Sequence, residues 1–87
     1  MDEKTKEAIL ANYAEPMAEA SGLSIYSRLT ENGVDIMPVC GYRERAALAD
    51  SLAQDLGRAG YSVEVYENGS HIFIESRKGG ATADGQT

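Results

Sequence analysis

Two stretches of the chain, "TENGVDI" at residues 30–36 and "YENGSHI" at residues 66–72, share a Glu-Asn-Gly triplet that stands one residue before a polar residue and an isoleucine. Asn-Gly is the strongest short-range hairpin signal, because both residues tolerate the positive φ angles of a type I′ turn. The residues on either side of each triplet alternate between apolar and polar, as half-buried strands do. The sequence therefore predicts two β-hairpins, one around each triplet.

The turn position fixes which residues face each other across the first hairpin. Counting outward from Asn32-Gly33 predicts Leu29 opposite Ile36 and Arg28 opposite Met37. The same count sets Ser27 opposite Pro38. Because proline has no N–H to donate, the ladder is expected to fray at that point.

The second hairpin, around Asn68-Gly69, has a clean alternation. On one face, counting outward pairs Val65 with Ile72 and Val63 with Ile74. On the other face it pairs Glu64 with Phe73 and Tyr66 with His71.

A helical pattern precedes each hairpin, over residues 2–20 and 42–59. Pro16 interrupts the first pattern, so this helix is expected either to kink or to end near Ala14 and restart with Pro16 in its first turn. Ser21-Gly22 and Gly60 are expected to end the two helices. Apolar residues recur every four positions, at Ile9, Tyr13 and Met17 in the first pattern and at Leu48, Leu52 and Leu56 in the second.

The two halves of the chain read as copies of one helix–strand–strand unit. "AILANYAEPMAEASG" from residue 8 aligns without gaps with "AALADSLAQDLGRAG" from residue 46. The order αββαββ predicts an α+β fold with a four-stranded antiparallel sheet, strand order 3-4-2-1, and two helices on one face. This is a circularly permuted ferredoxin-like arrangement, and a more open sheet or another packing of the two units is the alternative. Residues 1–77 are predicted to form a single domain, and residues 78–87 a disordered C-terminal tail.

The charge of the chain excludes several classes of partner. Its 14 acidic and 8 basic residues give a net charge of −6. Duplex DNA, RNA and anionic membranes select for Lys and Arg, so direct binding to any of them is not expected. The single cysteine indicates a reducing compartment. With no long apolar run and no secretory leader, the sequence predicts a soluble, cytoplasmic protein.

Residues capable of catalysis are few and do not form a recognised motif. Cys40 precedes a helix, but the Cys-x5-Arg spacing of phosphatase loops fails, because Arg45 comes one residue early and residue 46 is alanine. His71 is the only histidine, and it is expected on the opposite face and near the opposite end of the sheet from Cys40. No catalytic residues, no metal site and no cofactor are predicted, and the protein is expected not to be an enzyme.

The side of the sheet that the helices leave open is the predicted interface. Aromatic residues, methionine and arginine are enriched in interface cores, and an exposed patch of a few hundred Å² is typical of an interaction site. We expect this face to bind a partner protein or to form a homodimer. It is predicted to carry Tyr26, Arg28, Met37, Glu64, Tyr66, His71, Phe73 and Glu75.

In size, acidity, lack of motif and αββ organisation, the chain resembles the small phage-encoded inhibitors of host defence, of which anti-CRISPR proteins are the best known. That resemblance implies an inhibitor or adaptor whose carboxylates occupy a basic, nucleic-acid-handling groove of a target such as a CRISPR-type defence complex. Such pairing is sensitive to salt. The carboxylates on or beside the hairpins are Glu31, Asp35, Glu64, Glu67 and Glu75.

Three other functions remain open. One is a dimeric ferredoxin-like regulatory domain that binds a small ligand, which a pocket between the second helix and the sheet, or at a dimer seam, would favour. Another is peptidoglycan binding, since "PVCGYRERAALADSLAQDLGRAGYSVEVYENG" resembles the sporulation-related domain. The export or membrane segment typical of that family is not expected here. The last is an enzyme that depends on Cys40.

Overall fold

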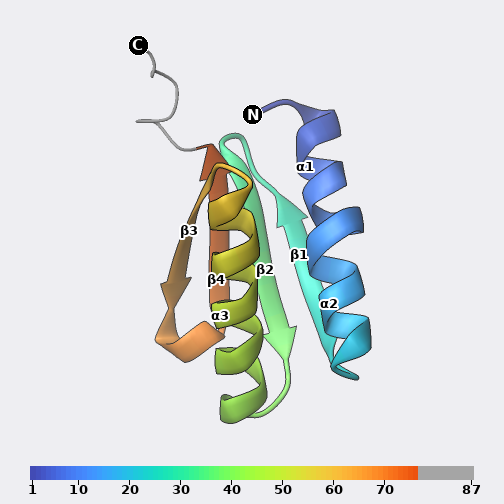
Figure 1. Cartoon of the computed structure of the whole chain (residues 1–87), viewed down its shortest axis with the longest axis vertical. Helices are drawn as coiled ribbons and strands as arrows, with labels where there is room; N and C mark the ends of the chain where they lie inside the picture. The colour runs from blue at the N-terminus through green and yellow to red at the C-terminus, as the bar shows by residue number, and fades with distance from the viewer. Residues whose placement is uncertain (77–87) are drawn as a thin grey trace.

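The computed structural model describes residues 1–76, so the predicted disordered tail at 78–87 lies outside the described residues. Two helical segments and two hairpins alternate along the chain (Figure 1). The first helical segment comprises α1 (Glu3–Ile9), a π-helical turn (Leu10–Ala14) and α2 (Glu15–Ala20), and the second is α3 (Tyr42–Arg58). The strands are β1 (Ser24–Leu29), β2 (Gly33–Val39), β3 (Tyr61–Tyr66) and β4 (His71–Ser76).

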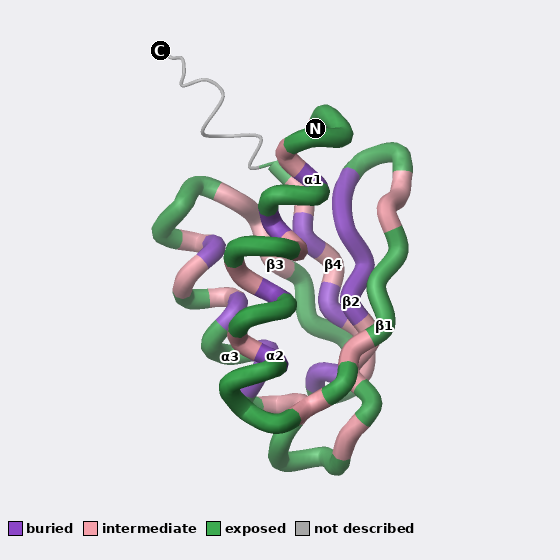
Figure 2. The backbone as a smooth tube through the Cα atoms, turned by 90° about the vertical axis from the view of Figure 1, so that its right-hand side faces the viewer, coloured by how far each residue is buried: buried purple, intermediate pink, exposed green. Residues whose placement is uncertain are grey.

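The four strands form one antiparallel sheet in the order β1-β2-β4-β3, which is the predicted order. Both helical segments lie on the same side of this sheet, and the other side has no helix among the described residues (Figures 1 and 2). The core lies between the two layers, where inward-facing residues of β2 and β4 meet the apolar stripes of the helices. It comprises Ile9, Ala14, Val34, Ile36, Leu48, Ala49, Leu52, Leu56, Ile72 and Ile74.

Pro16 leaves the first helical segment continuous but changes its hydrogen bonding. The N–H of Glu15 bonds to the carbonyl of Leu10, five residues earlier, which is the pattern of a π-helical turn. After this turn α2 begins at Glu15, so Pro16 lies in its first turn, where its missing N–H is not needed. The predicted position of Pro16 in a first turn is therefore confirmed, but the helical segment does not end before it. Gly22, with φ of +71°, follows the end of α2.

The predicted register of the first hairpin was wrong by two residues. Leu29 pairs with Val34 and Arg28 with Asp35, so the turn is centred on Glu31-Asn32 and Gly33 already belongs to β2. The Thr30 N–H bonds to the Gly33 carbonyl at 2.8 Å, and the Thr30 hydroxyl accepts a bond from the Gly33 N–H at 3.0 Å. Because a slip of two residues preserves the alternation, every side chain stays on its predicted face.

The ladder between β1 and β2 was expected to fray at Pro38, and it does not. Pro38 is part of β2 and lies opposite Ile25 of β1. Thr30 and Gly33 form a hydrogen-bonded pair, and such pairs alternate along an antiparallel ladder. Ile25 and Pro38 therefore form a pair that needs no N–H from the proline. On its other side β2 pairs with β4 only from Gly33 to Ile36, so Pro38 costs no bond there either.

The register of the second hairpin was predicted correctly, with Tyr66 opposite His71 and Val65 opposite Ile72. Its connection is a 3₁₀ turn, Glu67–Gly69, rather than a two-residue turn. Glu67, Asn68 and Gly69 have φ of 49°, 56° and 93°, so all three are left-handed. Gly69 is buried against the carbonyl of Arg45 on α3, where an added Cβ would lie 2.5 Å from the oxygen.

Candidate functional site

The helix-free side of the sheet, called here the open face, carries all eight side chains predicted for it. Its residues alternate along each strand with those that point into the core. Two turns flank it at opposite ends, with Glu31 exposed in the first and Glu67 exposed in the second. The open face comprises Tyr26 and Arg28 on β1, Met37 on β2, His71, Phe73 and Glu75 on β4, and Glu64 and Tyr66 on β3, with Asp35 of β2 at its centre.

Asp35 is the centre of a polar cluster that links three strands. One carboxylate oxygen, Oδ2, accepts a bond from Arg28 Nη2 on β1 at 2.9 Å. The other, Oδ1, lies 2.9 Å from His71 Nε2 on β4. Asp35 is only 5% exposed. It is therefore not a free carboxylate that could bind a basic partner, as was expected from the sequence. Its charge is compensated inside the chain.

The pKa of Asp35 reflects this environment. Burial, the largest single effect, raises the pKa, but hydrogen bonds and charge from Arg28 and His71 together outweigh it and hold the pKa below its ordinary value of 3.8. The carboxylate is therefore ionised at neutral pH and can only accept, so His71 donates through Nε2–H.

Sequence reasoning missed this cluster because it placed the first turn one residue too late. With the turn on Asn32-Gly33, Arg28 faces Met37, and with the turn on Glu31-Asn32 it faces Asp35. Opposite charges at directly facing positions stabilise an antiparallel pair. The charge pair itself was thus the signal that favoured the correct register.

Apolar side chains surround the polar cluster on the open face. Tyr26 on one edge strand is 69% exposed, and Tyr66 on the other edge strand is 49% exposed. Met37 and Phe73, on the two inner strands, are partly buried. Met37 lies directly opposite Tyr26, and Phe73 lies between Asp35 and Glu64 in the cross-strand register. The face is therefore mixed, with a compensated charge at its centre and apolar groups around it.

Tyr66, Glu64 and His71 form a second group at the β3 side of the open face. The Tyr66 hydroxyl donates to Glu64 Oε1 at 2.8 Å, and this bond is the main reason that the pKa of Tyr66 lies above its ordinary value of 10.0. The rings of Tyr66 and His71 meet edge to face, with centroids 6.0 Å apart and an interplanar angle of 85°. His71 thereby connects this group to Asp35.

Arg28 is bonded to Asp35, so the open face has little free positive charge. Glu64 remains exposed and Glu75 is half-buried, and neither has an ion pair with a cation among the contacts of residues 1–76. The unpaired charge of the face is therefore negative.

Cys40 and His71 are not arranged as a catalytic pair. Ile36 faces Ile72, so the end of β2 lies toward the start of β4, and both residues are at the same end of the sheet rather than at opposite ends as expected. His71 is already bonded to Asp35, and Cys40 is a half-buried free thiol. Within residues 1–76, no three His, Cys, Asp or Glu side chains cluster closely enough to hold a metal ion.

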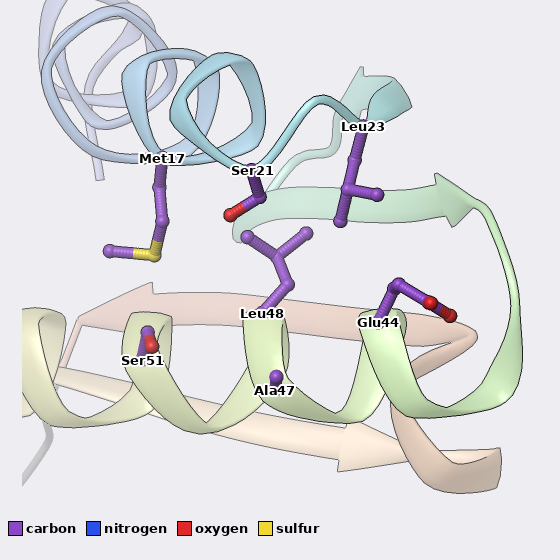
Figure 3. Close-up of a pocket in the computed structure, with 7 residues that line it drawn as sticks. All are labelled: Met17, Ser21, Leu23, Glu44, Ala47, Leu48 and Ser51. Carbon is purple, nitrogen blue, oxygen red and sulfur yellow. The ribbon is translucent and has the colours of Figure 1, made fainter.

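A cavity of about 190 Å³ lies between α2 and α3, beside the start of β1 (Figure 3). Met17 and Leu23 point from one side toward Leu48 on α3, which gives the cavity apolar walls. Its polar groups are the hydroxyls of Ser21 and Ser51 and the carboxylate of Glu44. The cavity is thus between the two helical segments rather than between the second helix and the sheet.

Comparisons with protein-family models, with curated proteins and with solved structures found no match to this chain. No helix within residues 1–76 has the length and apolar character required to cross a membrane.

Proposed function

We propose that this protein is a non-enzymatic protein-binding module, an inhibitor or adaptor that binds a basic surface of a partner protein through the open face. The observation that carries the proposal is the composition of that face. Exposed Tyr26 and Tyr66 flank the compensated Arg28–Asp35–His71 cluster, and the unpaired charges beside them are carboxylates.

Physical chemistry supports each part of this assignment. Tyrosines bury large areas at low entropic cost and supply a polar group, so they are frequent anchors in interfaces. Phe73 and Met37 extend the apolar area between them. The net charge of −6 favours encounter with a basic partner and disfavours nucleic acid itself.

The partner class that the phage-inhibitor resemblance implies is a cytoplasmic nucleic-acid-handling protein, such as a CRISPR-type effector. The fold proposed for this role is a circularly permuted ferredoxin-like one, which the strand order β1-β2-β4-β3 supports. In such a complex the carboxylates of the open face would occupy positions that nucleic-acid phosphates otherwise take.

The test compares two double variants that change net charge equally on different surfaces. Glu64→Lys with Glu75→Lys reverses the open face, and Glu7→Lys with Glu19→Lys reverses the exposed surface of the first helical segment. Each takes the net charge from −6 to −2, since every reversal adds two units. Binding to a purified CRISPR-type effector is measured by interferometry from 50 to about 500 mM salt, with a histone octamer as a second basic protein.

We expect the open-face variant to weaken binding to the effector at least tenfold, equivalent to ~1.4 kcal/mol, and the helix variant to leave it nearly unchanged. Wild-type binding should also weaken as salt rises. Equal losses for both variants would show that net charge rather than the open face determines binding. No binding of the wild-type protein to the effector, at any salt, would exclude this target class.

A second candidate function rests on the cavity between α2 and α3. A volume of about 190 Å³ suits a ring of roughly benzene size with one small substituent. Glu44 and the two serine hydroxyls favour an amine as that substituent. A regulatory domain that binds a small amine is therefore the alternative.

NMR titration with benzylamine tests this alternative. Saturable shifts at Met17 and Leu48, with an affinity of about millimolar for so small a ligand, would support it. Ala47→Phe, which fills the cavity from its exposed rim, should abolish the shifts. Absence of saturation, or shifts that survive Ala47→Phe, would exclude the cavity as a binding site.

A further inference from the structure

Strand β1 presents an edge that the rest of the described chain does not cover. It forms one side of the sheet, since β1 pairs only with β2 in the order β1-β2-β4-β3. Figure 2 looks onto this side of the molecule, and α1 and α2 lie to one side of β1 rather than across its outer edge. The edge is open along the whole strand.

The backbone groups that point outward from this edge follow from the ladder. Thr30 and Gly33 are hydrogen-bonded, and bonded pairs alternate, so Arg28, Tyr26 and Ser24 bond toward β2. The N–H and C=O groups of Ile25, Ser27 and Leu29 therefore point away from the sheet. No hydrogen bond within residues 1–76 engages these groups.

Strand β1 lacks the devices that usually protect an edge. Such edges are blunted by charged side chains, proline, bulges or very short length. The sequence of β1, "SIYSRL", is six residues long, pairs with β2 without a bulge and contains no proline, and its one charged residue, Arg28, is paired with Asp35 inside the sheet. Ile25 and Leu29 are only half-buried by the helices above them. A strand with these properties is a template for another strand.

We infer that β1 pairs antiparallel with β1 of a second copy of this chain, around a two-fold axis at Ser27, to form an eight-stranded sheet. This register joins outward-pointing groups to outward-pointing groups, with Ser27 facing its own copy and Ile25 facing the partner's Leu29. Each facing pair of this kind exchanges two backbone hydrogen bonds.

Side-chain chemistry selects this register over its neighbours. An axis at Ser27 sets Tyr26 opposite the partner's Arg28 on the open face. The ring then stacks with a guanidinium that is already oriented by Asp35, which is a favourable cation–π geometry. With an axis at Arg28, the two copies of Arg28 would face each other and their like charges would repel. With an axis at Tyr26, Ile25 would face the partner's Ser27 instead of an apolar residue. On the helix side, the Ser27 axis buries Ile25 against the partner's Leu29.

The dimer does not depend on the proposed function, because its backbone hydrogen bonds lie at the edge of the sheet, and of the open face only Tyr26 and Arg28 contact the partner across the seam. It makes the two open faces continuous across the seam. It also differs from a homodimer through the sheet faces, the arrangement expected from the sequence, and the two arrangements respond differently to substitutions.

The first test is sedimentation equilibrium of the full chain, whose single-chain mass is 9.3 kDa. We expect a mass of two chains for the wild-type protein at about 100 μM, and a dissociation constant at least tenfold higher for Tyr26→Arg, which opposes two cations across the seam. Tyr26 is 69% exposed in the single chain, so this substitution does not disturb folding. Tyr66→Arg, the matched change on the β3 edge, should leave the dimer intact.

A second substitution acts on the backbone itself. Ser27→Pro removes an N–H that the axis requires but that β2 does not use, as Pro38 already shows at an equivalent pair. It should produce a monomer. If circular dichroism shows that Ser27→Pro does not fold, the dissociation constant of Tyr26→Arg still tests the dimer.

Cross-linking locates the axis. In a Cys40→Ser background, Ser27→Cys places two thiols opposite each other, at a Cα separation of about 5.5 Å that permits a disulfide. Ser24→Cys, at another exposed serine at the start of the strand, should not cross-link. A wild-type monomer at all concentrations, a dimer that Tyr66→Arg breaks, or equal cross-linking at both positions would overturn the inference.

Discussion

The two Glu-Asn-Gly triplets contain the same three residues and form different turns. In the first, no residue has positive φ, and the turn is closed by the Thr30 side chain. In the second, Glu67, Asn68 and Gly69 are all left-handed. The same tripeptide therefore does not define one turn type, and the surroundings of each hairpin select it.

Each hairpin is positioned by a contact with another element. Gly33 lies against the carbonyl of Ile74 on β4, where an added Cβ would be 2.0 Å from the oxygen. Gly69 lies against the carbonyl of Arg45 on α3. Both glycines are thus required for close backbone approach, and only Gly69 is also required for its φ. Through its glycine, the first hairpin packs against a strand, whereas the second packs against a helix.

The largest predicted effect separates these two glycines. Gly33→Ala should destabilise the protein by about 3 kcal/mol or more, because the obstructing carbonyl belongs to the β2–β4 ladder and cannot move without breaking it. Gly69→Ala should cost less, ~2 kcal/mol, because the turn can shift away from α3. Urea unfolding followed by circular dichroism measures both.

Gly22→Ala is the control for conformational strain alone. Its φ is +71°, but no atom lies within 4 Å of an added Cβ, so the expected cost is about 1 kcal/mol. A Gly33→Ala variant no less stable than Gly22→Ala would contradict the close approach of β2 to β4.

A basic side chain from the preceding helix bonds to a turn carbonyl in each hairpin. Lys6, buried on α1, donates through Nζ to the carbonyls of Thr30 and Glu31. Arg45, on α3, donates through Nε to the carbonyl of Asn68 at 3.4 Å in an exposed position. The helix alignment sets Lys6 against Glu44 rather than Arg45, so the two contacts are not equivalent positions of a repeat.

Lys6→Met should therefore cost more than Arg45→Met. Removing the ammonium leaves two carbonyls without their donor in a partly buried site, which costs ~2 kcal/mol, whereas loss of the exposed Arg45 bond costs at most about 0.5 kcal/mol. Thermal unfolding of both variants measures the difference. Lys4→Met, an exposed lysine on the same helix, should be neutral. Equal stability of Lys6→Met and Lys4→Met would contradict a structural role for Lys6.

The order of the elements was sufficient for the strand order. Sequence periodicity was sufficient for the membership of the open face, because alternation survives a slip of two residues. It was not sufficient for the partners of Arg28. The position of the first turn depends on the Thr30 side chain and on the close approach of Gly33 to Ile74, and neither contact is visible in a local pattern. The Asp35 cluster was missed for the same reason. The second register was predictable because its turn residues tolerate the left-handed region in any case.

Asp35 tests the cross-strand pairing that distinguishes the first hairpin. Asp35→Asn should lower stability by ~1 kcal/mol at neutral pH, since the charge-assisted bonds to Arg28 and His71 are weakened. The pKa of Asp35 is lowered in the folded state, so its contribution is complete above the ordinary carboxyl range and is lost as pH falls through the folded pKa. The stability difference between wild type and variant should shrink below about pH 4.

Urea unfolding at a series of pH values from neutral to about 3 measures this difference. Asp50→Asn, at an exposed site on α3, provides the matched change and should show no difference at any pH. A gap between wild type and Asp35→Asn that stays constant as the pH is lowered would contradict the assigned hydrogen bonds.

The smallest predicted effect concerns the second hairpin, whose polar pair runs along one strand instead of across two. The Tyr66 hydroxyl bonds to Glu64 in an exposed position, so Tyr66→Phe should not change stability measurably.

The pKa of Tyr66 lies above 10.0 chiefly because of that bond, and Glu64→Gln should therefore let Tyr66 ionise at lower pH. Ultraviolet titration, taken as the difference from the matching Tyr66→Phe protein, isolates this tyrosine among the five. An unchanged titration in Glu64→Gln would mean that the bond does not persist in solution. Tyr66 would then be free to present its hydroxyl to a partner, whereas a persistent bond holds the ring in one orientation on the open face before any partner arrives.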